Sequence, residues 1–304
     1  MRRRVSPLLV LPMLLLAVAV MALTPMGASA ATPMGAKAHP NIRFFPHVSK
    51  GGVKSNVVPS ARNNLIYNGG PVMTGTANVF AIYWEPTGSV QANYNSLINR
   101  YFGDVNGQGL YNNNKQYTQS GGGAATGTRL AGTWVDNSAY PESPLLDSDI
   151  QNEVSNAQSV NGWSSSIDNI FFVFLESGQD LCFDSSFSQC ASNTFCAYHS
   201  TFGTNTIYAA MPYAASFSCN PGSSPNNNDA DQTINVTSHE QMEAATDPLL
   251  NAWFDASGSE IGDKCAWNFG SRNSSGADVV YHSHGYILQK EWDNARGGCV
   301  LTGP

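Results

Sequence analysis

Two uninterrupted apolar runs constrain the fold of this chain more than any other feature. Residues 79–84 and 170–175 are apolar on both faces of an extended segment and are rich in residues that favour strands. Such runs predict strands that are buried on both sides. A shorter run, residues 207–211, predicts a third strand. We therefore expect a core built around a sheet.

Helices are predicted before, between and after these strands. They cover residues 91–102, 147–157 and 231–246. The second is expected to have Asp147 or Ser148 as its cap, and the third ends before Pro248. Residues 103–138 are rich in Asn, Gly, Gln and Tyr, which predicts loops and weak edge strands. Two or three short strands are expected between residues 278 and 301.

The N-terminus has the pattern of a secretory signal. Arginines at residues 2–4 precede an apolar run at residues 5–23, and small residues at 28–30 form a cleavage site. Residues 31–62 lack periodicity, which is typical of a flexible leader or pro-segment. We expect a secreted protein, in the extracellular space or at a cell wall, with no stable membrane anchor after cleavage of residues 1–30. Its folded domain would span residues 63–304.

Charge and cysteine content narrow the class of protein further. Loss of the signal removes three arginines and no acids, so the formal charge changes from −7 to −10. This balance argues against nucleic acid and anionic membranes as partners. Six cysteines in an exported chain predict three disulfides, although the sequence alone does not choose the pairing. The pairing that we expect is Cys182–Cys190, Cys196–Cys219 and Cys265–Cys299.

Residues 239–243, His-Glu-Gln-Met-Glu, are the most informative stretch for function. Residues four apart lie on one face of a helix, so His239 and Glu243 can bind one metal ion. The layout is that of the zinc-hydrolase motif H-E-x-x-H, with a carboxylate in place of the second imidazole. In such a hydrolase Glu240 would be the general base that takes a proton from water activated by the metal.

A third metal ligand is required, and it is expected about twenty residues beyond the helix motif. Asp263 is the first choice and Glu260 the second, because Asp263 is close to Cys265, where a disulfide would hold it in place. Asp247 is expected to orient His239.

His199 is a further candidate. It follows Cys196 by three residues, which would suit a Cys-His nucleophile, but a disulfide at Cys196 removes the thiolate. We expect His199 instead to approach the metal helix, as a ligand or as a donor to the reacting group.

Other interpretations of the acidic residues remain open. Asp255, Glu260 and Asp263 could form a Ca²⁺ site in an extracellular protein. Glu240 and Asp263 could be the paired carboxylates of a carbohydrate-active enzyme. The charges around Glu243 could also be solvated residues on an exposed helix.

Several motifs together resemble the Exordium, or phosphate-induced protein, family and its bacterial relatives. They are residues 67–75, Tyr-Asn-Gly-Gly-Pro-Val-Met-Thr-Gly, leading into residues 82–84; residues 195–199, Phe-Cys-Ala-Tyr-His; and residues 238–265, which hold the helix motif and Glu-Ile-Gly-Asp at 260–263. The resemblance implies secretion to the cell wall or extracellular space, and it does not imply a reaction.

The sequence thus predicts one secreted, disulfide-bonded α/β (α+β) domain with a zincin-like sheet-plus-helix core. The favoured function is Zn²⁺-dependent hydrolysis of an extracellular protein, peptide or cell-wall substrate. The alternative is a non-catalytic extracellular or cell-wall protein with a structural cation site.

Overall fold

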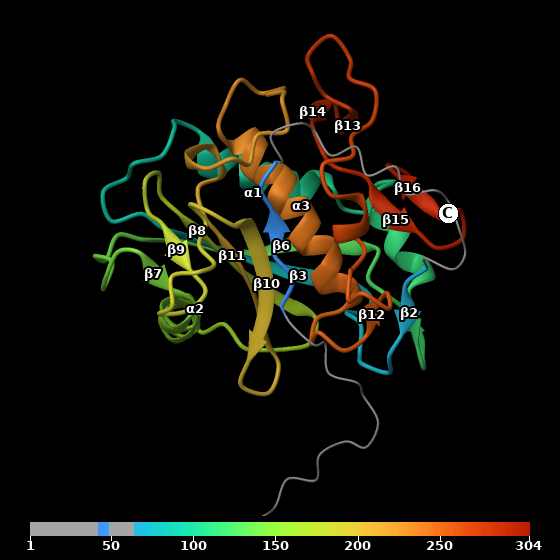
Figure 1. The fold of residues 1–304 in the computed structure, drawn as a ribbon, viewed down its shortest axis with the longest axis horizontal. Coiled ribbons are helices and arrows are strands. Elements are labelled where there is room, and N and C mark those ends of the chain that lie inside the picture. The colour runs from blue at the N-terminus through green and yellow to red at the C-terminus, as the bar shows by residue number, and fades with distance from the viewer. Residues whose placement is uncertain (1–41, 49–63) are drawn as a thin grey trace, which may run out of the picture. The chain divides into compact units, whose positions relative to one another are not determined.

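A six-stranded mixed sheet forms the core of the fold (Figure 1). The computed structural model describes residues 42–48 and 64–304; the predicted signal and most of the leader lie outside the described residues. In order across the sheet the strands are β1 (Phe45–Pro46), β10 (Phe195–Phe202), β11 (Thr206–Met211), β8 (Asn169–Leu175), β3 (Thr76–Trp84) and β6 (Gly127–Asp136). The last four are parallel to one another, β10 is antiparallel to β11, and β1 is antiparallel to β10.

Helices cover both faces of this sheet (Figure 1). Alternate residues of β3 belong to two separate apolar clusters. The cluster that contains Val79 includes side chains of α1 (Tyr94–Asp104) and α3 (Ala230–Thr246). The cluster that contains Phe80 includes side chains of α2 (Asp147–Asn161). Burial of both faces explains why the strand runs are continuously apolar, and the predicted mixed α/β class is confirmed.

The cap of α2 differs from the expectation. The N-cap residue is Leu146, and its backbone N–H donates to Asp149 Oδ2 at 2.8 Å. The helix therefore begins at Asp147. Asp147 cannot cap because its Oδ1 accepts the hydroxyl groups of Tyr198 and Tyr208, at 2.7 and 2.6 Å. The third helix, predicted at residues 231–246, is present as α3.

Three strands of the main sheet were not located from the sequence. β1 lies in the segment expected to be a flexible leader, and β10 lies in the cysteine-rich stretch. The ten-residue β6 lies in the region expected to form loops and weak edge strands, and it is an edge strand of the sheet. The tail forms two hairpins, of β13 (Val279–Tyr281) with β14 (His284–Tyr286) and of β15 (Glu291–Asp293) with β16 (Gly298–Val300). The remaining short pairs are β2 (Ile66–Tyr67) with β12 (Trp253–Phe254), β4 (Thr118–Gln119) with β5 (Gly122–Gly123), and β7 (Leu145–Leu146) with β9 (Leu181–Cys182).

Three disulfides connect these elements, and their pairing is the one expected. Cys182–Cys190 closes the loop that precedes β10, Cys196–Cys219 joins β10 to the segment after β11, and Cys265–Cys299 joins the short helix η4 (Asp263–Cys265) to β16. Two of these bridges therefore fix segments that contribute to the site described next.

Candidate metal centre

Helix α3 is buried along its length although many of its residues are polar. His239, Glu240 and Glu243 are each at most 1% exposed. Burial of polar groups is costly unless they find partners. Gln241 does so, because it donates to Thr128 Oγ1 at 2.9 Å and accepts the hydroxyl of Tyr101 at 3.1 Å. The interpretation of the motif as solvated helix charges is therefore wrong, and the partners of His239, Glu240 and Glu243 must be sought inside the protein.

The motif residues meet Asp263 inside the protein. His239 Nε2 lies 3.1 Å from Glu243 Oε2, as expected for residues four apart on a helix. Asp263 Oδ1 lies 3.9 Å from the same nitrogen. The backbone N–H of Asp263 donates to Glu243 Oε1 at 3.0 Å, which fixes the start of η4 against the helix. Asp263 thus approaches His239 with its carboxylate and Glu243 with its backbone. Among the described residues, the sets around the helix whose possible ligand atoms all lie within 4.8 Å of one another are His239, Glu240 and Glu243, and His199, Glu243 and Glu260.

Strand β10 brings a second histidine to the same place. His199 Nδ1 lies 3.5 Å from Glu240 Oε2 and 3.7 Å from Glu243 Oε2. Its Nε2 lies 3.7 Å from Glu260 Oε1. The expected approach of His199 to the helix is present. We call these side chains the His-carboxylate cluster: His199, His239, Glu240, Glu243, Glu260 and Asp263.

Burial changes the acidity of every carboxyl in the cluster. Loss of hydration raises the pKa of Glu243 and that of Asp263 to about 7. Burial, followed by repulsion from neighbouring carboxylates, raises the pKa of Glu260 well above its usual range. Burial also raises the pKa of Glu240 and lowers that of His239. A divalent cation would let these carboxyls ionise at neutral pH.

The donor set suits such a cation. His239 Nε2, His199 Nδ1 and both carboxylate oxygens of Glu260 have no hydrogen-bond partner within the described part of the chain. Two ligands of a tetrahedral zinc ion, each about 2.1 Å from it, lie about 3.4 Å apart. The separations of 3.1 Å and 3.9 Å around His239 Nε2 bracket that value. Nitrogen and carboxylate donors together are typical of zinc.

Neighbouring residues hold the imidazole of His239. Gln289 Nε2 lies 2.9 Å from His239 Nδ1 and donates to the carbonyl of Gly262 at 3.0 Å. In this orientation Nδ1 accepts the amide hydrogen, so the ring proton of the neutral imidazole is on Nε2. The amide is held in this orientation because its oxygen accepts the backbone N–H of Trp267 at 3.3 Å. Gly262 is required by close approach, because a Cβ there would lie 2.4 Å from His239 Nδ1.

Two expectations for the acidic residues need correction. Asp247 was expected to orient His239, but its Oδ1 accepts the backbone N–H groups of Asn251 and Ala252, at 2.5 and 2.6 Å. Its backbone carbonyl lies 3.3 Å from His199 Nε2, so it positions the other histidine.

The Ca²⁺ site proposed from Asp255, Glu260 and Asp263 does not form a common set of ligands. Lys264 Nζ donates to Asp255 Oδ2 at 2.8 Å, and Asp255 Oδ1 accepts N–H groups of its own turn. Asp255 is thus engaged elsewhere, while Glu260 and Asp263 belong to the His-carboxylate cluster.

Sequence reasoning missed three residues that border the cluster. Gln289 and Glu291 come from the tail, some fifty residues from the helix motif, and Glu291 is fully buried. Phe45 stacks on the His239 ring with 4.2 Å between ring centroids. No local spacing connects these residues to the motif. The one local signal is the period of two that places Gln289 and Glu291 on the same side of an extended segment.

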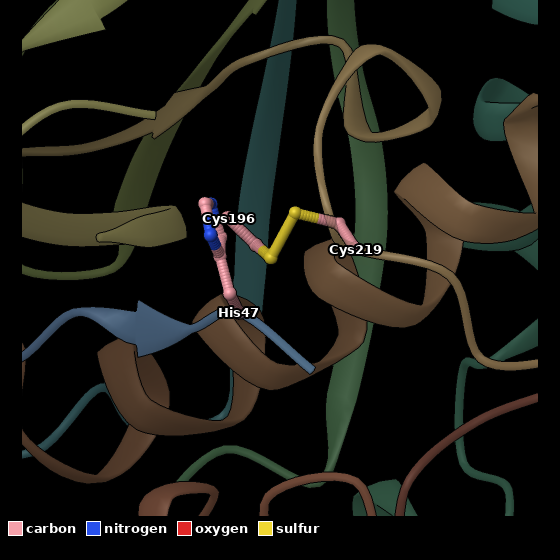
Figure 2. A group of neighbouring side chains, drawn as sticks. All are labelled: His47, Cys196 and Cys219. Atoms are coloured by element: carbon pink, nitrogen blue, oxygen red, sulfur yellow. A yellow bond between two sulfur atoms is a disulfide. The ribbon is translucent and has the colours of Figure 1, made fainter. Parts of the chain in front are cut away.

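A second group of possible ligands is ruled out by its chemistry. His47 lies beside Cys196 and Cys219, but Figure 2 shows that the two sulfur atoms are bonded to each other. His47 Nε2 instead contacts the carbonyl oxygens of Ala191 and Phe195, at 2.7 and 3.1 Å. The disulfide also removes Cys196 as a nucleophile, as expected.

Comparison of the sequence with protein families and with curated proteins finds no match. Among the described residues, no helix combines the length and the apolar character needed to cross a membrane.

Proposed function

We propose that this chain is a secreted, Zn²⁺-dependent hydrolase with a zincin-like core, related to the Exordium family, and that it acts on peptide bonds. The observation that carries the proposal is the approach of two carboxylates to His239 Nε2, Glu243 at 3.1 Å and Asp263 at 3.9 Å, with Glu240 on the next position of the same helix. The placement of α3 beside β10, an antiparallel strand that only the two-residue β1 separates from the edge of the sheet, supports the zincin-like assignment. Three disulfides support an oxidising, extracellular setting.

Each residue has a distinct role in this proposal. His239, Glu243 and Asp263 would hold the cation, which when bound polarises the scissile carbonyl and lowers the pKa of water. Glu240 would accept the proton of the attacking water and later return it to the leaving group. His199, beside Glu240, would donate to the developing negative charge.

A second candidate function is favoured by the complete burial of the centre. His239 and Glu240 are 0% exposed, and Phe45 covers the imidazole. A structural cation in a non-catalytic extracellular protein would explain this burial. The two functions share the metal and differ in whether Glu240 takes part in turnover.

Metal analysis combined with two variants tests the proposal. Purified protein should contain about one zinc per chain. Glu240→Gln should keep the metal and lower peptide hydrolysis by about 10²–10⁴-fold, whereas His239→Ala should lose both. Glu153→Gln is the matched control, because Glu153 is a buried carboxyl with a raised pKa on α2, on the other face of the sheet.

Calcium in place of zinc, or no bound metal, would contradict the metal assignment. Zinc binding with a Glu240→Gln variant that matches the wild type in every assay would leave the structural cation as the function.

A further inference from the structure

Residues 42–48, which we call the strap, lie along the outer edge of the sheet next to the cluster (Figure 1). β1 pairs antiparallel with β10, with Phe45 opposite Ala197 and Pro46 opposite Phe195. The contact continues where the N–H of Val48 donates to the carbonyl of Ser218 at 2.9 Å. The strap therefore pairs with the sheet through its main chain at two residues, in the way that an extended peptide adds to a sheet edge.

The side chain of Phe45 closes the cluster on this side. It is 0% exposed and is stacked between two rings, with centroid distances of 4.2 Å to His239 and 4.6 Å to Trp267. The indole N–H of Trp267 donates to the carbonyl of Pro46 at 2.9 Å. Phe45 thus fills a space between Trp267 and His239, and His239 is a proposed metal ligand.

Charge complements this contact. The guanidinium of Arg43 donates to the carbonyl oxygens of Ser257 and Gly258, in the turn that leads to Glu260. Burial has the largest effect on the pKa values of Glu243 and Asp263, and it raises both. The positive charge of Arg43 has a smaller effect and lowers both pKa values. The strap therefore places the positive charge of Arg43 near the carboxyl groups of the His-carboxylate cluster.

A pocket of about 630 Å³ runs beside the strap. Ile42, Arg43, Phe44 and Pro46 line one side of it, and Asp263 lies on its wall. The side chain of Asp263 is 11% exposed, whereas those of the other cluster residues are at most 1% exposed. The cluster thus opens toward the space that the strap borders.

We propose that the edge of β10 is the substrate cleft of this protein, that it takes an extended polypeptide with an aromatic residue over His239, and that the strap occupies this cleft as an internal ligand. That the bound polypeptide is a substrate rests on the proposed function. That the edge of β10 binds a polypeptide rests only on the strand pairing and ring stacking of the strap. Substrate enters when the strap leaves the edge of β10, so the intact chain is self-blocked.

Peptide binding in trans tests the cleft without any metal. The probe is a fluorescently labelled heptapeptide with the sequence of residues 42–48, added to the full chain in the presence of a chelator. The intact chain should bind it weakly, because a tethered segment competes at an effective concentration of the order of mM. The double variant Arg43→Ala/Phe45→Ala should bind it at least tenfold more tightly, and Phe187→Ala, at an exposed position, should behave as the wild type.

A cleavable form of the protein provides a second test that does not depend on the folding of the double variant. A site-specific protease sequence inserted after Gly51 allows the folded chain to be cut between the strap and β2. The cut protein should bind the heptapeptide, and a heptapeptide with alanine in place of Phe45 should bind at least tenfold more weakly, which is about 1.4 kcal/mol.

Two results would overturn the proposal: no gain in peptide binding by the folded double variant or by the cut protein, or equal binding of the alanine peptide. A separate arm adds Zn²⁺ and measures hydrolysis of longer peptides by the cut protein. Peptide binding without zinc uptake or hydrolysis would sustain the cleft and refute the proposed hydrolase, so the two failures are distinguishable.

Discussion

Removal of divalent cations should make the stability of this protein fall as the pH rises. The pKa of Glu243 is raised from 4.5 to about 7 in the folded protein, and that of Asp263 from 3.8 to about 7. Between the unfolded and folded values, the folded state binds more protons than the unfolded state. The free energy of unfolding then decreases with pH, and the loss is complete once the pH passes the folded pKa.

The size of the effect follows from the two shifts. At about 1.4 kcal/mol per pKa unit, the shift of Glu243 corresponds to about 3 kcal/mol and that of Asp263 to about 4 kcal/mol. The groups repel each other, so their effects do not add in full. We expect a total loss of several kcal/mol between about pH 4 and about pH 7. Excess Zn²⁺ should reverse the trend toward neutral pH, because the cation binds the deprotonated ligands.

Urea unfolding followed by tryptophan fluorescence, at several pH values, measures this change with chelator and with Zn²⁺. The background should carry Glu153→Gln, since burial raises the pKa of Glu153 to about 8 and gives the same sign of dependence. Adding Glu243→Gln and Asp263→Asn should make the curve less steep, and the slope that remains comes from Glu240, Glu260 and Asp247, whose pKa values are also raised by burial. Metal-free stability that stays level or rises over this pH range would refute the assignment of buried, cation-dependent carboxyls.

Two further predictions concern the support of the site. Gly262→Ala should displace the His239 ring and weaken zinc binding by about 10–100-fold in a competition assay, whereas Gly298→Ala, where a Cβ meets nothing within 4 Å, should not change it. Replacing both Cys196 and Cys219 with serine should lower the free energy of unfolding by about 3 kcal/mol in urea, because the bridge closes a 23-residue span; unchanged urea midpoints would contradict this role.

The parts of the fold that could be predicted are those whose burial is uniform. β3 and β8 are covered on both faces, so their apolar runs indicate strands directly. β10 was missed because its residues, Phe-Cys-Ala-Tyr-His-Ser-Thr-Phe, are dominated by small and polar types, and its pairing with β11 decides its conformation. β1 has only two residues, and its strand state depends entirely on β10.

The same distinction applies to the candidate site. His239 and Glu243 could be related because helical spacing places them on one face, and Asp263 because it follows within a short distance along the chain. Gln289 and Phe45 reach His239 only through tertiary packing. These contacts do not correspond to any fixed spacing in the sequence. A motif search therefore finds the proposed ligands and misses the residues that cover and orient them.

The burial of α3 also has a consequence for assembly. Its 17 residues include several β-branched and short polar types, which are weak helix formers, and its cluster side chains meet partners from β10, η4 and the tail. Such a helix gains its stability from packing. The site is thus complete only after the last quarter of the chain has docked, so the proposed cation would bind late in folding, after α3 has packed.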